Sequence, residues 1–329
     1  MASAPVFTIG RREVSSAAAE AIRIAKLDPD ALFDRHERGD WGEAPDWLKC
    51  DNERAALLSR YSHAIRSHYT LVMLHEIVVI TARDRSRTRM MLASEFSTHE
   101  VSVQEGYARW ATFYDHPNPL ISVEEPVVDA LLTGLPPVTS AIDVGTGTGR
   151  LARKVARRGA GSVLGVDATP EMLCVARENA RSEGLHNLRF ELGVLGEDPL
   201  PVAAASVELL TCGLMLCHLP DLRHALRECV RVVRPGGWLL LSDFHPSTSF
   251  FGWRTDFIDL DGIHLLPNTP NTRQDYLDAL TDAGCRILDV HDIALDGAPY
   301  GDISDAAIKA KGLPPLCLVI LAQATTATA

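Results

Sequence analysis

The chain has 329 residues, of which 46% are apolar and 23% are charged, a composition typical of a globular protein with one large or two ordinary domains. Its 32 basic and 43 acidic side chains give a formal net charge of −11, which disfavours partners such as nucleic acid or an anionic membrane surface. No apolar run is as long as a membrane span and no signal-peptide pattern opens the chain. We therefore expect a cytoplasmic protein.

The seven cysteines are scattered along the chain, and none forms a Cys-x-x-Cys pair. Most of them lie within apolar patterns typical of strands or helices. This spacing predicts buried, reduced thiols, with neither a disulfide framework nor a metal site.

Residues 1–97 differ in pattern from the rest and predict a small α+β accessory domain. Ser15 and Ser16 are typical caps for an alanine-rich helix over 17–25. A second helix is expected over 28–36 and a third at Asn52-Glu53-Arg54, and extended runs follow over three ranges, 61–65, 71–80 and 87–92. The alternating arginines of the last part, Arg83 to Arg89, are expected on a solvated strand face, with phosphate binding as the alternative.

This region resembles a short domain that is common in bacterial and plasmid-encoded proteins. The resemblance is carried by two stretches, His36-Glu-Arg-Gly-Asp-Trp-Gly42 and Thr81-Ala-Arg-Asp-Arg-Ser-Arg-Thr88. It implies a domain boundary and no particular activity. Trp41, next to His36, is expected to anchor a tight turn, with a functional site at His36 as the alternative.

An amphipathic helix is predicted within residues 98–122, with Tyr107, Trp110 and Tyr114 on one face. We expect it to bridge the two domains and to cover the site as a lid. From residue 123 to 329 strands and helices alternate, which predicts an α/β domain: a doubly wound, mostly parallel seven-stranded sheet of the Rossmann-like kind with helices on both faces. The expected strands cover 141–144, 162–166, 188–192, 207–211, 238–242, 286–293 and 316–321.

The stretch Ala141-Ile-Asp-Val-Gly-Thr-Gly-Thr-Gly-Arg150 is a strand that turns through three glycines into a helix. Such turns bring the backbone close to a bound dinucleotide or to S-adenosylmethionine (SAM). The dinucleotide spacing Gly-x-Gly-x-x-Gly requires a glycine where Arg150 stands. Asp143 is placed to accept from an ammonium group, and Asp167, which ends the next strand, to accept from both ribose hydroxyls. The pattern favours SAM.

From about Tyr107 to Ala322 the sequence resembles the class I SAM-dependent methyltransferases, in particular the small-molecule branch similar to the ubiquinone and menaquinone enzymes. The glycine turn, Cys212-Gly-Leu-Met-Leu-Cys-His218-Leu-Pro-Asp221 and Arg231-Val-Val-Arg-Pro-Gly-Gly237 carry this resemblance. It implies that Asp143, Gly145, Gly147 and Asp167 bind SAM. Thr146 and Ala168 then lie beside the cofactor, and Cys212 faces its methionine portion.

Two positions depart from the family pattern. Val194 stands where an acid usually accepts from the adenine amino group. Either backbone groups near Leu195 and packing against Met172 hold the adenine, or the affinity for the cofactor is weakened. Asn271 stands where relatives often carry a histidine. The usual base is therefore not expected at Asn271.

Candidate catalytic residues lie where the strand ends meet the lid helix, because the carboxyl ends of parallel strands are where ligands bind. His245 follows the fifth strand and His218 the fourth. Tyr107 and Tyr114 belong to the lid, and Asn271 closes a substrate-side insertion over 244–272. Either histidine is a candidate base, and the tyrosines are candidate contacts to substrate or methionine.

The sequence thus predicts a SAM-dependent methyltransferase for a small-molecule acceptor, working by alignment and desolvation. One alternative is attack on another sulfonium carbon of SAM, by cyclisation or aminocarboxypropyl transfer, which releases methylthioadenosine. A further alternative is a non-catalytic SAM-binding module. The acceptor and the oligomeric state stay open, and a homo-oligomer is compatible with the sequence.

Overall fold

The computed structural model describes residues 4–57, 64–71, 75–115, 118–251, 254–294 and 315–325. Contacts between Cα atoms divide the chain into two compact units: Met1–Val101 with Asp256–Leu266, and Ser102–Thr255 with Pro267–Ala329. The predicted insertion 244–272 is therefore split between the units. The reason is strand pairing, because β12 (Gly262–Leu265) pairs in parallel with β5 (Ser97–Glu100) and antiparallel with β11 (Asp256–Asp259).

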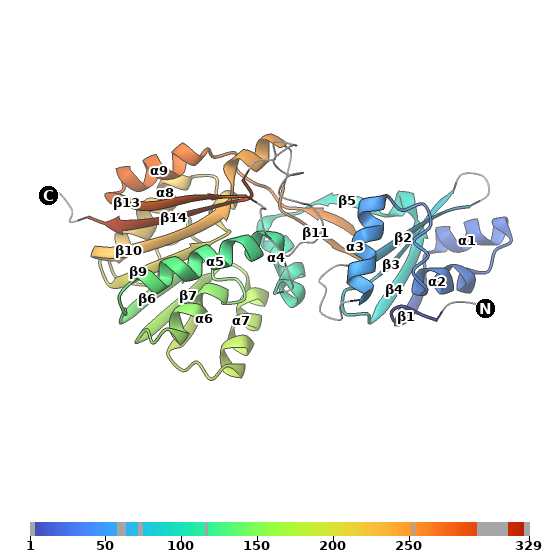
Figure 1. Ribbon diagram of the computed structural model, residues 1–329, viewed down its shortest axis with the longest axis horizontal. Helices are drawn as coiled ribbons and strands as arrows, with labels where there is room; N and C mark the ends of the chain where they lie inside the picture. Colours follow the sequence, from blue (N-terminus) through green and yellow to red (C-terminus); the bar gives the residue numbers. More distant parts are fainter. Residues whose placement is uncertain are drawn as a thin grey trace. The chain divides into compact units, whose positions relative to one another are not determined.

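The first unit combines helices with a four-stranded sheet (Figure 1). The sheet has the order β1 (Arg11–Val14), β4 (Arg87–Leu92), β3 (Glu76–Thr81) and β2 (Ile65–Thr70), and β1 is parallel to β4. The helices are α1 (Ser16–Ala25), α2 (Pro29–Glu37) and α3 (Asp46–Leu57). The Ser15 side chain accepts from the backbone N–H of Ala18, as predicted for a cap. Parts of two expected strands, 61–63 and 72–74, lie outside the described residues.

The two sequence stretches singled out in the first unit meet inside it. The His36 ring is fully buried, with Nδ1 2.5 Å from the Ser67 hydroxyl and Nε2 2.9 Å from the Thr81 hydroxyl. Thr81 contacts Thr88 at 2.7 Å, and the Thr88 hydroxyl donates to the Ile9 carbonyl. These side chains therefore connect a helix, three strands and the N-terminal segment, which is a structural role for the motif.

The second unit contains the predicted seven-stranded, mostly parallel sheet. Its order is β13 (Cys285–Ile293), β14 (Cys317–Ala324), β10 (Val233–Phe244), β9 (Val207–Gly213), β6 (Ser140–Val144), β7 (Ser162–Asp167) and β8 (Leu188–Leu192). Only β14 runs antiparallel to its neighbours β10 and β13. The switch in strand order lies between β6 and β9, the position at which open α/β sheets bind ligands.

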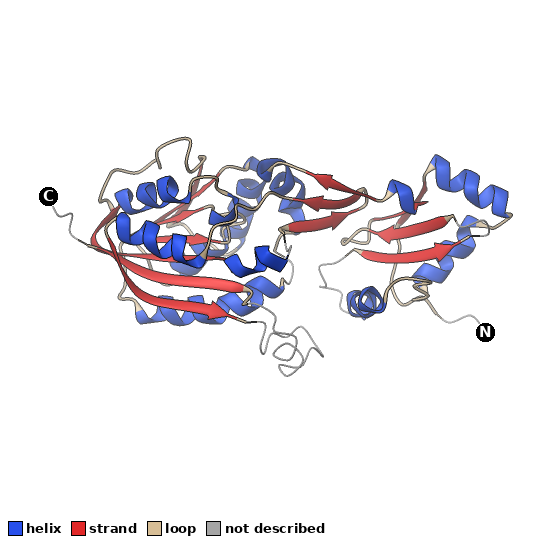
Figure 2. Ribbon diagram, turned by 90° about the horizontal axis from the view of Figure 1, so that it is seen from above, coloured by secondary structure: helices blue, strands red, loops and turns tan. Residues whose placement is uncertain are grey.

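Helices cover both faces of this sheet, as Figure 2 shows. One core layer contains residues of α5 (Pro119–Gly134), α6 (Arg150–Arg157) and α7 (Pro170–Ser182), and the other contains residues of α8 (Leu222–Val232) and α9 (Arg273–Asp282). The lid helix is shorter than expected: α4 covers Val103–Trp110 and continues as a 3-10 turn over Ala111–Phe113. Among the described helices, none has the length and apolarity needed to cross a membrane.

Candidate active site

The glycine turn between β6 and α6 is a tight left-handed loop. Gly145, Gly147 and Gly149 have φ angles of +65°, +53° and +82°, which other residues adopt only with strain. A Cβ atom on Gly145 would lie 2.6 Å from Cγ of Met215, whereas a Cβ on Gly147 would meet nothing within 4 Å. The loop thus needs glycine both for its backbone and to leave space for a ligand.

The buried side chain of Asp143 accepts hydrogen bonds from the glycine turn and its neighbours. Oδ2 accepts from the Thr146 hydroxyl at 2.6 Å and from the Ala152 N–H at 3.1 Å, and Oδ1 accepts from the Thr211 hydroxyl at 2.6 Å. Burial raises the pKa of Asp143 to about 6, against the effect of these donors. This differs from the prediction that Asp143 accepts from an ammonium group, because both oxygens are turned into the protein.

Asp167, at the end of β7, faces the ligand side of the loop. Oδ2 accepts from the Gly147 N–H and Oδ1 from the Thr169 N–H, each at 2.8 Å. Burial raises the pKa of this carboxyl, while the backbone donors oppose the shift. Each oxygen keeps a lone pair for a ligand hydroxyl.

These elements surround a cavity of about 370 Å³ at the carboxyl ends of the strands. Ten of the predicted site residues line it: Tyr107, Tyr114, Gly145, Gly147, Asp167, Ala168, Met172, Val194, Leu195 and His218. Its lining among the described residues includes the acids Asp167, Glu197 and Asp221 and contains no Lys or Arg. The cavity is therefore suited to a cationic ligand.

Tyr107 and His218 form a hydrogen-bonded pair in the cavity wall. His218 Nδ1 lies 2.7 Å from the Pro267 carbonyl, and Nε2 lies 2.9 Å from the Tyr107 hydroxyl. A carbonyl only accepts, so Nδ1 carries the hydrogen, and Nε2 of the neutral ring accepts from Tyr107. Burial lowers the pKa of His218 and raises the pKa of Tyr107 well above its usual 10. The resting pair is therefore neutral, and its free basic atoms are oxygen lone pairs of Tyr107.

Tyr107 belongs to an aromatic cluster on the lid. Its ring stacks with Trp110 at a centroid distance of 5.9 Å and meets the edge of Tyr114 at 5.9 Å. Burial raises the pKa of Tyr114 to about 12, so its hydroxyl is protonated, and Tyr114 lines the same cavity. These contacts fix the direction in which the Tyr107 hydroxyl points.

His245 and Asn271 lie elsewhere. They line a second, much smaller cavity of about 10 Å³ together with Cys217 and Tyr276. His245 Nε2 lies 3.1 Å from Asp292 on β13, and Nδ1 accepts from the Ser247 N–H at 3.2 Å. In the part of the chain that is described, the structure does not bring His245 together with Tyr107 and His218.

Two other predicted cofactor residues do not line the large cavity. Thr146 is buried and donates its hydroxyl to Asp143, and Cys212 points into the core while the next residue, Gly213, lines the cavity. Sequence reasoning did not single out several lining residues that follow β9 or begin α4: Ser102, Val103, Gln104, Leu214, Met215, Leu219 and His224. Their sequence positions, after a strand end or at the start of the lid helix, could have indicated that they line the cavity.

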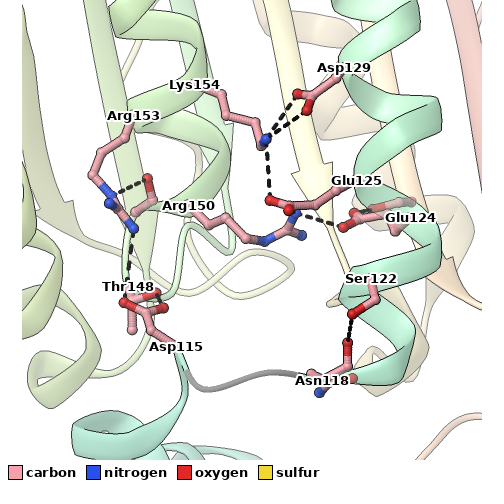
Figure 3. Close-up of polar contacts among 12 residues, drawn as sticks. Asp115, Asn118, Ser122, Glu124, Glu125, Asp129, Thr148, Arg150, Arg153 and Lys154 are labelled. Atoms are coloured by element: carbon pink, nitrogen blue, oxygen red, sulfur yellow. Dashed lines mark hydrogen bonds and ion pairs between the residues drawn. The ribbon is translucent and has the colours of Figure 1, made fainter. Parts of the chain in front are cut away.

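Charged side chains behind the glycine turn join α5 to α6 (Figure 3). Arg150 Nη1 lies 2.6 Å from Oε2 of Glu124, which is fully buried and also accepts from the Ser242 hydroxyl on β10. Lys154 forms an ion pair with Asp129 at 2.9 Å. Arg150, which breaks the dinucleotide spacing, thus anchors the start of α6 on its neighbours.

Comparison with known proteins finds matches to methyltransferases. Residues 142–241 match the family model described as a methyltransferase domain. The ubiquinone biosynthesis O-methyltransferase of Paracidovorax citrulli is 33% identical over 148 residues, which is 44% of this chain and 60% of that protein. The arsenite methyltransferase of Halobacterium salinarum is 35% identical over 118 residues, or 35% of this chain and 29% of that protein.

Among solved structures, a chain from the complex of the Haloferax volcanii Trm112 methyltransferase activator superimposes with a TM-score of 0.52. It is 20% identical, and the match covers 69% of this chain and 99% of that one. This likeness supports the Rossmann-like fold. Residues 142–241 therefore match a methyltransferase domain, and the chain spans 60% and 29% of the length of the two curated relatives.

Proposed function

We propose that the protein transfers a methyl group from SAM to a hydroxyl group of a small, uncharged acceptor. The observation that carries this proposal is the Tyr107–His218 pair, because it places a proton acceptor in the same cavity as the glycine turn and Asp167. When bound, SAM supplies a methyl group on a positively charged sulfur. The acidic, lysine- and arginine-free lining of the described cavity matches such a cation.

The residues fit the cofactor part by part. Asp167 accepts from the ribose hydroxyls, and the open space over Gly147 lets the backbone approach the ligand. Met172 and Leu195 enclose the adenine at the end where Val194 replaces the usual acid. Asp143 acts as a positioning residue, since it holds Thr146 and the start of α6 through three hydrogen bonds.

The pair of Tyr107 and His218 supports a hydroxyl acceptor. A hydroxyl oxygen becomes a good nucleophile only as it loses its proton, whereas a neutral amine attacks first and loses its proton afterwards. Bound SAM would supply the methyl group, and the proton that the acceptor hydroxyl loses would pass to the Tyr107 oxygen. The Tyr107 proton passes to His218 Nε2, while the Pro267 carbonyl keeps holding the Nδ1 hydrogen. The Paracidovorax relative is itself named an O-methyltransferase.

The acceptor is proposed to be uncharged because the described lining offers no cation to hold a phosphate or carboxylate. The acceptor has to share a cavity of about 370 Å³ with the cofactor, which favours a small molecule. The net charge of −11 also disfavours nucleic acid as the acceptor.

Single substitutions in the pair test the proposal. Tyr107→Phe keeps the ring contacts and removes the hydroxyl, so kcat with a hydroxyl acceptor should fall about 100-fold or more while the Kd for SAM stays unchanged. His218→Gln should lower kcat similarly. His245→Gln should retain the rate, because His245 is bound to Asp292 and Ser247 outside the cavity. A rate that depends on His245 and not on Tyr107 would refute the assignment.

The product separates this function from the other two hypotheses. Methylthioadenosine as the product would mean that another sulfonium carbon is attacked. Tight SAM binding without any product, across a panel of phenols, alcohols and amines, would favour a binding module.

A further inference from the structure

A buried arginine in the first unit has no counterion among the described residues. Arg66 lies on β2 and is 8% exposed. Its strand neighbours Ile65 and Ser67 face the helices, where Ile65 packs near Trp41 and Ser67 contacts His36. Because side chains alternate along a strand, Arg66 faces the opposite side of the sheet. It lies there opposite Ile80, whose apolar cluster includes Leu260 in the turn between β11 and β12.

The guanidinium group of Arg66 has no hydrogen-bond acceptor among the described residues, and its Nε is fully buried. It stacks over the Phe96 ring, 4.9 Å from the centroid. Other arginines of this unit are paired: Arg35 with Asp40 at 2.7 Å and Arg89 with Asp261 at 2.5 Å. Burial lowers the pKa of Arg66, and no acidic group opposes that shift. A buried cation in this situation is costly unless an anion accompanies it.

A second unpartnered polar atom lies beside it. His68 is two residues along β2 and therefore on the same face, and its Nε2 is buried without a partner in the described structure. Burial, and then the charge of Arg66, lower the pKa of His68, whereas Glu76 and Glu43 raise it. The two groups are thus electrostatic neighbours, and the neutral ring can turn an Nε2–H donor toward the same ligand.

We propose that Arg66 and His68 form a binding site for a compact oxyanion, a carboxylate or a phosphate group. The planar guanidinium group presents Nε–H and an Nη–H side by side, which matches two oxygens of such a group, and the imidazole supplies a third donor. The site lies in the first unit and is independent of methyl transfer.

The charges around the site favour a small ligand over a polyanion. The net charge of the chain is −11, and the neighbouring arginines are used internally: Arg89 pairs with Asp261, and Arg85 donates to the Ala55 carbonyl at 2.8 Å. A single buried guanidinium group recognises one oxyanion, whereas a nucleic acid backbone needs a row of exposed cations.

Thermal unfolding of the full chain tests the site. Sodium phosphate, sulfate or acetate is titrated at ionic strength held constant with sodium chloride. The proposal predicts that Tm rises with the logarithm of the oxyanion concentration in at least one series and that Arg66→Gln abolishes this rise. Arg87→Gln, which changes an exposed arginine of the same sheet, should keep it. A larger effect of phosphate identifies a phosphoryl ligand, and a larger effect of acetate identifies a carboxylate.

An NMR titration covers the case in which Arg66→Gln fails to fold. In protein labelled with ¹⁵N-arginine, phosphate or acetate should shift one Nε–H resonance, and that resonance should be missing in Arg66→Lys, which keeps the charge. Either of two results overturns the proposal: no arginine resonance shifts up to tens of millimolar anion, or the Tm rise is the same in Arg66→Gln as in the unchanged protein.

Discussion

The buried His36 makes the first unit sensitive to acid. Burial, and to a smaller extent the charge of Arg85, lower the pKa of His36 to about 3, against about 6.5 in an unfolded chain. The folded state therefore keeps this ring neutral while the unfolded state binds a proton below pH 6.5. The contribution of His36 to the free energy of unfolding is fully present above pH 6.5, and it is lost as the pH falls from 6.5 toward 3.

Within this window each pH unit lowers the free energy of unfolding by about 1.4 kcal/mol. At pH 5 the titration of His36 alone therefore lowers it by about 2 kcal/mol. His36→Gln provides the comparison, because an amide can hydrogen-bond to Ser67 and Thr81 but does not titrate in this range. Urea unfolding of the full chain at pH 7.5 and at pH 5, with hydrogen exchange to resolve β2–β4, measures the difference.

The expected result is that the wild-type protein loses about 2 kcal/mol more than His36→Gln between the two pH values, although the variant is less stable at pH 7.5. Carboxylates contribute to the pH dependence of both proteins equally, so they cancel in this comparison. Equal losses in wild type and variant, or a loss confined to the sheet of the second unit, would refute the role assigned to His36.

Three further substitutions test the cofactor side. Gly145→Ala should weaken SAM binding and lower Tm, because its Cβ would lie 2.6 Å from Met215 at a φ of +65°; unchanged calorimetric affinity would contradict this. Asp167→Asn should raise the Kd for SAM about 10- to 100-fold, measured by isothermal titration, and an unaltered Kd would remove the ribose assignment. Glu124→Gln should lower the free energy of unfolding by about 3 kcal/mol, since it leaves the Arg150 charge without its buried partner; a urea midpoint equal to that of wild type would show that the pair is not stabilising.

Much of the fold was predictable because it depends on local patterns. The order of strands and helices in the second unit follows from apolar runs separated by glycine-rich turns, and the capping serine of α1 is readable directly. The pairing of β12 with β5 could not be predicted, because more than 150 residues separate the two strands and neither has a distinctive sequence pattern. That pairing places 256–266 with the first unit.

The site was predictable to the level of the loop and less well to the level of side-chain direction. Asp143 and Asp167 both end strands beside the turn, yet only Asp167 faces the cavity, since the curl of the loop brings Thr146 and Ala152 onto Asp143. His218 and His245 likewise both follow strands. Asp292, far along the chain, holds His245 outside the cavity, and no local pattern indicates such a contact.

The central claim is that the cavity supports methyl transfer to a hydroxyl group. It is tested most directly by incubating the purified full chain with SAM carrying a deuterated methyl group and a panel of small phenols, alcohols and amines, followed by mass spectrometry. The account predicts S-adenosylhomocysteine in equal amount to a product that carries the labelled methyl on oxygen. Labelled methylthioadenosine, or a labelled methyl found only on nitrogen or carbon, would contradict it.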